Sequence, residues 1–162
     1  MSNINNTPAN YYGYMKTLAE RHDLIKHTEN EKHFFRGELE EFYIGLKNKV
    51  NFPAMIAEGF TLNYGDNLQR KERESSFIIA EKYTEQKDYG DIDRAFNLCE
   101  IIGEEIIRRL LEDEEFNDCA TFEAVSAVQI INEMEKYVGI RFTITANSPF
   151  FEDINPEMWA DL

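Results

Sequence analysis

Two glutamates are the clearest candidates for acid–base chemistry, because each interrupts an apolar segment that the sequence predicts to be a strand. Glu58 lies within Ala54–Tyr64, and Glu81 lies within Ser75–Thr84. A buried carboxyl group has a raised pKa, and such groups recur in catalytic sites. Ion pairs that only stabilise a fold also shift the pKa values of carboxyl groups. We therefore favour a glutamate that is paired with Arg or Lys, or that faces solvent.

The histidines and cysteines form no recognisable metal site or nucleophile. His22, His27 and His33 make no HExxH motif, and Cys99 and Cys119 make no CxxC motif. Two cysteines are also too few for a disulfide framework. Cys99 falls in an apolar helical run, which predicts a small buried hydrophobe. Cys119 has no histidine near it in the sequence that could activate its thiol.

Motifs for binding phosphate or presenting a serine nucleophile are also missing from the sequence. The chain contains no GxxxxGK[ST], no GxGxxG and no GxSxG. We therefore predict no catalytic residues, no cofactor and no metal, and a protein that is not an enzyme. An enzyme whose site is invisible in local sequence stays open as a hypothesis. A deep pocket holding Glu58 or Glu81 beside a basic residue would favour it.

The chain is strongly acidic, with 31 Asp and Glu against 17 Lys and Arg and a net charge of −14. Nucleic-acid binding needs a cationic footprint. The best local candidate is Arg70, Lys71 and Arg73, but Glu72 and Glu74 are interleaved with it. We therefore expect no sequence-specific binding to nucleic acid. The charge instead predicts solubility and attraction to basic partner surfaces.

Length and composition predict one folded domain. A chain of 162 residues that is 43% hydrophobic and 13% aromatic can bury a real core, and it is too apolar for a disordered protein. No apolar stretch reaches the roughly 20 residues that a membrane span needs. Met1–Asn10 is polar and Asn-rich, so we expect no signal peptide and a protein that folds in a cytosol.

The N-terminal part is expected to be helical after a flexible arm at residues 1–10. Residues 11–27 carry apolar side chains at steps of three and four, which predicts a helix. A second stripe predicts another helix over Phe34–Asn48, although Phe42–Leu46 could also be a strand.

Period-two alternation then predicts a strand over Ala54–Tyr64 and a second strand over Ser75–Thr84. The short connection between them favours an antiparallel hairpin, with Gln69–Glu74 either in the connection or extending the strand. On the first strand, one face is expected to carry Ile56, Phe60, Leu62 and Tyr64.

The clearest helix is predicted over Ile92–Asp113, with Asp91 as its N-cap. Glu112–Glu115 place negative charge at its C-terminal end, against the helix dipole. That acidic segment, continued to residue 118, indicates either a solvated helix end or contact with a basic partner. The apolar face of this helix comprises Ile92, Ala95, Phe96, Cys99, Ile102, Gly103, Ile106 and Leu110.

Two further strands are predicted near the C-terminus. Phe122–Ile131 is apolar on both faces, which favours a central strand. Lys136–Gly139 is expected to form a turn before Ile140–Ala146, a strand with one buried and one wet face. The fold class is therefore α+β: N-terminal helices, then ββ-α-ββ with an antiparallel sheet packed against a long helix, in a single domain over residues 11–147.

Residues 148–162 are expected to form a C-terminal tail without periodicity. Phe150–Ile154 combines two aromatic residues with two acids, as an interface peptide would. The alternative is that Phe150, Phe151 and Trp159 complete the core of the protein itself. The sequence leaves both interpretations open.

The order of elements resembles that of the tail-terminator and tail-completion proteins of tailed bacteriophages. The resemblance rests on Phe52–Ile56 entering a strand, the helix Ile92–Leu111 and the ending Val138–Ile144, and it covers most of residues 11–147. It implies a non-enzymatic ring subunit, often hexameric, that joins the tail tube to the head-side connector of the neck. Such a protein belongs to the virion and is assembled in the cytoplasm of the host bacterium.

Two functions follow as hypotheses from these observations. The first is a structural ring subunit, as the resemblance implies. The second is an acidic cytosolic binding module, of the inhibitor or immunity type, that neutralises a basic partner; it rests on charge and size alone.

Overall fold

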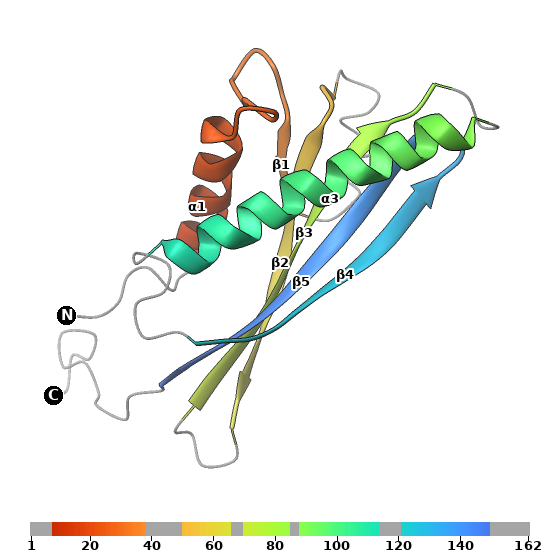
Figure 1. Cartoon of the computed structure of the whole chain (residues 1–162). Helices are drawn as coiled ribbons and strands as arrows, with labels where there is room; N and C mark the ends of the chain where they lie inside the picture. The colour runs from red at the N-terminus through yellow and green to blue at the C-terminus, as the bar shows by residue number, and fades with distance from the viewer. Residues whose placement is uncertain (1–7, 38–49, 66–69, 85–87, 114–120, 150–162) are drawn as a thin grey trace, which may run out of the picture.

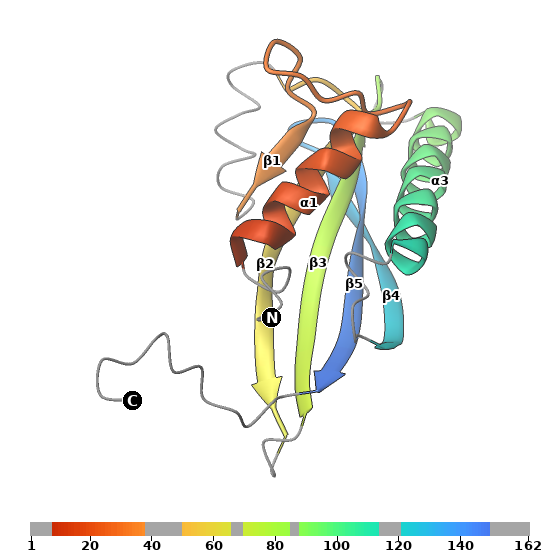
Figure 2. The same cartoon turned by 90° about the vertical axis from the view of Figure 1, so that its left-hand side faces the viewer.

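The computed structural model describes residues 8–37, 50–65, 70–84, 88–113 and 121–149. Within these residues two helices lie over one face of a five-stranded sheet (Figures 1 and 2). The predicted α+β class is confirmed. In chain order the elements are α1 (Pro8–Arg21), β1 (Phe34–Arg36), β2 (Ala54–Tyr64), β3 (Arg70–Lys82), α3 (Tyr89–Glu112), β4 (Thr121–Asn132) and β5 (Tyr137–Pro149).

The sheet has the strand order β1-β2-β3-β5-β4 and is mixed. β2 and β3 form the predicted antiparallel hairpin, and the charged segment from Arg70 onward belongs to β3. β3 pairs with β5, and β5 with β4, also antiparallel. β1 runs parallel to β2, so the expectation of a purely antiparallel sheet is wrong.

The predicted helix over Phe34–Asn48 is wrong at its start, because Phe34–Arg36 forms β1; residues 38–49 lie outside the described residues. Phe34 packs against the core beneath the helices, whereas Phe35 packs on the opposite side of the sheet. A strand places neighbouring side chains on opposite faces, which a helix cannot do. Gly37, with a φ of 105°, follows the strand in a conformation that glycine adopts readily.

Helix α1 covers Pro8–Arg21 instead of residues 11–27. Its start takes in three residues of the expected flexible arm, and the rest of that arm lies outside the described residues. At its other end the chain turns, with Lys26 at a φ of 50°, and this turn carries Ile25 into the core. The apolar spacing thus correctly indicated that Ile25 is buried, but burial is achieved by a turn.

Helix α3 begins earlier than expected. Asp88 is the N-cap, and its carboxylate accepts a hydrogen bond from the backbone N–H of Asp91 at 3.2 Å, so the prediction of Asp91 as N-cap is wrong. The predicted apolar face of this helix, in contrast, is the face that packs into the core. Its fully buried members are Ala95, Cys99, Ile102, Gly103, Ile106 and Leu110.

A bulge in β2 changes which residues share a face. The register with β3 shifts between Ala57 and Phe60, because β2 has one more residue there than its partner. The extra residue reverses the alternation, so Phe60 packs on the helix side with Met55 and Ala57. The sequence placed Phe60 on the face of Ile56, and this assignment is wrong.

For the last two strands, the expected central position of β4 is wrong, whereas the expected alternation of buried and more exposed residues is seen in β5 from Ile140 to Thr145. β4 was predicted to be central but is an edge strand, and β5 lies inside the sheet between β3 and β4. The turn between them is Glu133–Lys136, not Lys136–Gly139. Ser148 and Pro149 continue β5, so part of the expected tail is strand. Residues 150–162 lie outside the described residues.

The main core lies between the helices and the sheet, with buried side chains from α1, β2, β3, α3 and β5. A smaller cluster lies on the opposite face, around Ile56, Ile78 and Tyr137. In the main core the rings of Phe77 and Phe142 stack at a centroid distance of 5.1 Å. Gly103 of α3 lies directly over Phe142, so helix and sheet approach closely at this point.

We predict that Gly103→Ala destabilises the protein, because the added Cβ would overlap the ring of Phe142. Overpacking of this kind costs about 1–3 kcal/mol. The matched control is Gly13→Ala in α1, where a Cβ meets no atom within 4 Å. The control should leave the free energy of unfolding unchanged or raise it by up to about 1 kcal/mol. Urea denaturation measures both changes; equal effects of the two substitutions would contradict the proposed contact.

Candidate functional site

Glu58 is held by an ion pair that joins two strands. Both oxygens of its carboxylate accept hydrogen bonds from Arg141, one from Nε at 2.7 Å and one from a terminal nitrogen at 2.8 Å. Glu58 belongs to β2 and Arg141 to β5, so the pair reaches over β3, which lies between these strands. A two-pronged pair of this kind fixes geometry. The expectation that Glu58 is paired with a basic residue is confirmed.

Glu81, near the end of β3, is different, because one of its carboxylate oxygens is buried without a hydrogen-bond partner. Burial raises the pKa of Glu81, while nearby Arg94 acts in the opposite direction. Burial, with a smaller contribution from the same carboxyl group, raises the pKa of Cys99 to about 12. A neutral, buried thiol is a poor nucleophile. The expected burial of Cys99 is therefore confirmed; Cys119 lies outside the described residues.

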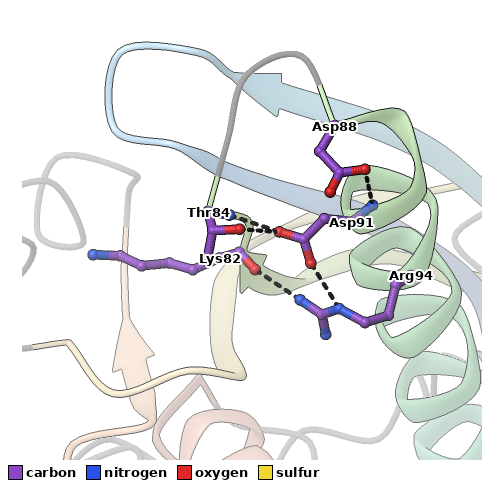
Figure 3. Close-up of polar contacts among 5 residues, drawn as sticks. All are labelled: Lys82, Thr84, Asp88, Asp91 and Arg94. Atoms are coloured by element: carbon purple, nitrogen blue, oxygen red, sulfur yellow. Dashed lines mark hydrogen bonds and ion pairs between the residues drawn. The ribbon is translucent and has the colours of Figure 1, made fainter.

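A polar network beside Glu81 joins the end of β3 to the first turn of α3 (Figure 3). One carboxylate oxygen of Asp91 accepts hydrogen bonds from the backbone N–H of Thr84 at 2.7 Å and from its hydroxyl at 2.9 Å. The other accepts from Arg94, whose guanidinium also donates to the carbonyl of Lys82. These hydrogen bonds lower the pKa of Asp91, and the bond from the backbone N–H of Thr84 has the largest effect. These bonds link Thr84 and Lys82 at the end of β3 to Asp91 and Arg94 of α3, so the network attaches the helix to the sheet.

The three histidines act as parts of turns. Nδ1 of His27 accepts hydrogen bonds from the backbone N–H groups of His33 and Phe34, both at 3.1 Å, which ties β1 to the turn after α1. Nδ1 of His33 lies 2.8 Å from the carbonyl of Pro53, and Nδ1 of His22 accepts from the N–H of Leu24. Within the described residues, no three His, Cys, Asp or Glu side chains gather in a way that could hold a metal ion.

The basic residues Arg70, Lys71 and Arg73 do not form a patch. Neighbouring residues of β3 point to opposite faces of the sheet, so Lys71 and Arg73 lie on the helix side and Arg70 on the other. Arg73 is buried with its guanidinium over the ring of Phe60, 4.7 Å from the centroid, and Arg70 pairs with Glu123 of β4. Alternation along a strand thus disperses charges that are adjacent in sequence.

The acidic end of α3 is described only as far as Asp113. Its carboxylate accepts a hydrogen bond from the hydroxyl of Tyr14 at 3.0 Å, so this part of the acidic segment fastens α3 to α1. Residues 114–118 lie outside the described residues, as do the aromatic segment Phe150–Ile154 and Trp159. Whether these segments form an interface stays a prediction.

The edge strand β4 is the most unusual surface of the described protein. Val128 is 61% exposed, Val125 is 44% exposed and Ile131 is 55% exposed, and Met134 in the following turn is almost fully exposed. Val125 and Ile131 lie on the helix side of β4 but are not covered by α3, which packs over β3 and β5, whereas Val128 lies on the opposite face of the sheet. From Ala124 to Asn132 the strand carries no charged residue, in a chain of which 30% of the residues are charged.

Proteins normally protect an exposed sheet edge with lysine, proline, a bulge or a covering element. β4 has a register shift near its start, between Phe122 and Ala124, but its remaining length pairs regularly with β5 on one side. No described strand pairs with its other side. Sequence reasoning identified the apolar faces of this strand and missed their exposure. The absence of charge from Ala124 to Asn132 was the available signal.

The comparisons with known proteins provide no family for this chain: no protein-family model matches it, and neither does a curated protein. No helix in the described ranges is both long enough and apolar enough to cross a membrane. The interpretation of the surface therefore depends on its own chemistry.

We predict that Glu81→Gln stabilises the protein at pH 7. The pKa of Glu81 is raised in the folded state, so its ionised form opposes folding once the pH exceeds the value of an unfolded glutamate, about 4.3. The stability gained by the substitution should therefore be present at pH 7 and shrink as the pH falls towards 4. Urea denaturation across this range measures it.

The control for this experiment is Glu100→Gln, which removes the same charge from an exposed position on α3. It accounts for the general repulsion in a chain of net charge −14. If both substitutions change the free energy of unfolding by the same amount at every pH, burial of Glu81 is not the cause.

Proposed function

We propose that this protein is a non-enzymatic structural subunit that assembles with copies of itself through β4. The observation that supports the proposal is the exposed, uncharged edge strand. Main-chain hydrogen bonds along such an edge can add a strand from another chain, and the alternating side chains then pack against the partner. The resemblance in element order to phage tail-terminator and neck proteins adds the expectation of a ring in the virion, between tail tube and head-side connector.

A second copy of the chain is the occupant favoured by charge. Each copy has a net charge of −14, so most ways of bringing two copies together would place like charges against each other. Glu100, Glu104 and Glu105 on the exposed side of α3 would do so. The segment Ala124–Asn132 is a place where two acidic copies can meet without charge repulsion.

The sheet also offers a second edge that would allow a ring. β1 pairs only with Met55–Ala57, so the outer side of β2 from Glu58 to Tyr64 has no strand partner among the described residues. Contact between β4 of one copy and β2 of the next would be head-to-tail. Such a contact produces a closed ring when the rotation between subunits closes, and an open filament when it does not.

We predict that Val128→Lys weakens self-association by about tenfold or more, because an unpaired charge would be buried in the interface. The matched control is Leu24→Lys, which replaces another half-exposed apolar side chain far from β4 with the same charge. Light scattering coupled to size exclusion should give a multiple of 19.0 kDa for the wild type and the control, and a smaller mass for Val128→Lys.

Electron microscopy of the same samples tests the shape, with rings expected for the wild type. A wild-type protein that stays monomeric at all concentrations would refute self-assembly. If that monomer also captured one basic protein in a one-to-one complex, the acidic inhibitor or immunity-type module would replace the ring. Equal masses for the two lysine variants would exclude β4 as the interface.

A further inference from the structure

A polar pocket of about 300 Å³ lies at the far end of the sheet, away from the cluster around Tyr137. It is formed where the β2–β3 hairpin meets the end of β5 and the start of β4. Its lining residues are Asn63, Tyr64, Gly65, Arg70, Glu72, Glu123 and Asn147.

Three of these side chains form a row across the sheet. Asn63 of β2 is opposite Glu72 of β3, and Glu72 is opposite Asn147 of β5. Residues opposite one another in antiparallel strands share a face, so the three point to the same side. That side faces away from the helices, because alternation along β3 separates Glu72 from the core residue Phe77. The row therefore lies on the face of the sheet that α1 and α3 do not cover.

Asn147, at one end of this row, lacks hydrogen-bond partners for its side chain. Its side chain is 4% exposed, yet neither its amide nitrogen nor its amide oxygen has a hydrogen-bond partner. A buried amide without partners is costly, so such groups in folded proteins are normally satisfied by protein, water or ligand. Asn63, at the other end of the row, differs from Asn147 because its side-chain amide donates a hydrogen bond to Glu72 at 3.3 Å.

The charges around Asn147 select the kind of ligand. Arg70 is paired with Glu123, which leaves Glu72 as the acid without a cation among the lining residues. The pocket thus combines one net negative charge with an amide oxygen that needs a donor. Ligand pockets usually measure about 300–1,000 Å³, so this one, at the lower end, has room for a side chain or a small molecule.

We propose that this pocket binds a guanidinium group, either of a small molecule or of an arginine side chain. A planar guanidinium presents several N–H donors in a fork, which suits Glu72 and the amide oxygen of Asn147 together. If the guanidinium belongs to an arginine residue, the amide nitrogen of Asn147 would also donate to a carbonyl of that residue's backbone. The site goes beyond self-assembly, since its central residues belong to β2, β3 and β5.

The probe is N-acetyl-L-arginine amide, added to ¹⁵N-labelled full-length protein. The side-chain amide signal of Asn147, assigned by its loss in Asn147→Ser, should shift and saturate. The equivalent citrulline amide has nearly the same shape without charge, and we expect it to bind at least tenfold more weakly. Agmatine, which lacks the backbone carbonyl, separates the two sources: tighter binding of agmatine indicates a small molecule, and tighter binding of the arginine amide indicates a protein side chain.

The variant that tests the charge is Glu72→Gln, which should weaken binding of the arginine amide at least fivefold. Its control is Glu74→Gln, on the same strand and the same face but outside the pocket lining, which should leave binding unchanged. The proposal is overturned if the signal of Asn147 does not shift, if the citrulline and arginine amides bind equally, or if Glu72→Gln binds as well as the wild type.

Discussion

The close contact between Gly103 of α3 and the ring of Phe142 in β5 is the constraint on which the rest of the structure depends. The ring stacks on its cross-strand neighbour Phe77 on the same face of the sheet, and a side chain on the helix at position 103 would separate the two layers. This contact fixes α3 over β3 and β5. Because the helix is placed there, its apolar stripe completes the core without reaching β4. The exposure of Val125 and Ile131 on the helix side of β4 is thus a consequence of where the helix lies.

Of the two glutamates that first suggested chemistry, Glu58 helps to hold this arrangement through its ion pair with Arg141, whereas Glu81 has a buried oxygen without a partner. Asp91 and Arg94 attach the start of α3 to the end of β3. The surfaces available to other molecules are different ones: the uncharged edge of β4, and the polar row around Asn147 at the end of the sheet.

Much of the fold followed from local patterns. The bounds of β2 and the buried face of α3 were predicted from alternation and from three- and four-residue spacing, which are properties of short segments. Errors arose where one residue changes the outcome. The bulge after Ala57 moves Phe60 to the other face, and the choice of Asp88 over Asp91 as N-cap depends on where the chain turns. Either acid satisfies the local rule for a cap.

The sequence by itself determined that the chain is acidic, that its fold is α+β, that Cys99 is buried and that Phe122–Ile131 is an apolar strand. Only the tertiary structure decided that this strand lies at the edge and that Asn147 is buried without a partner. The physical reason is the same for the strand and for Asn147. The pattern of side chains along a segment indicates which of them can be buried. Whether they are buried depends on strand order and helix placement, which are set by contacts between residues far apart in the chain.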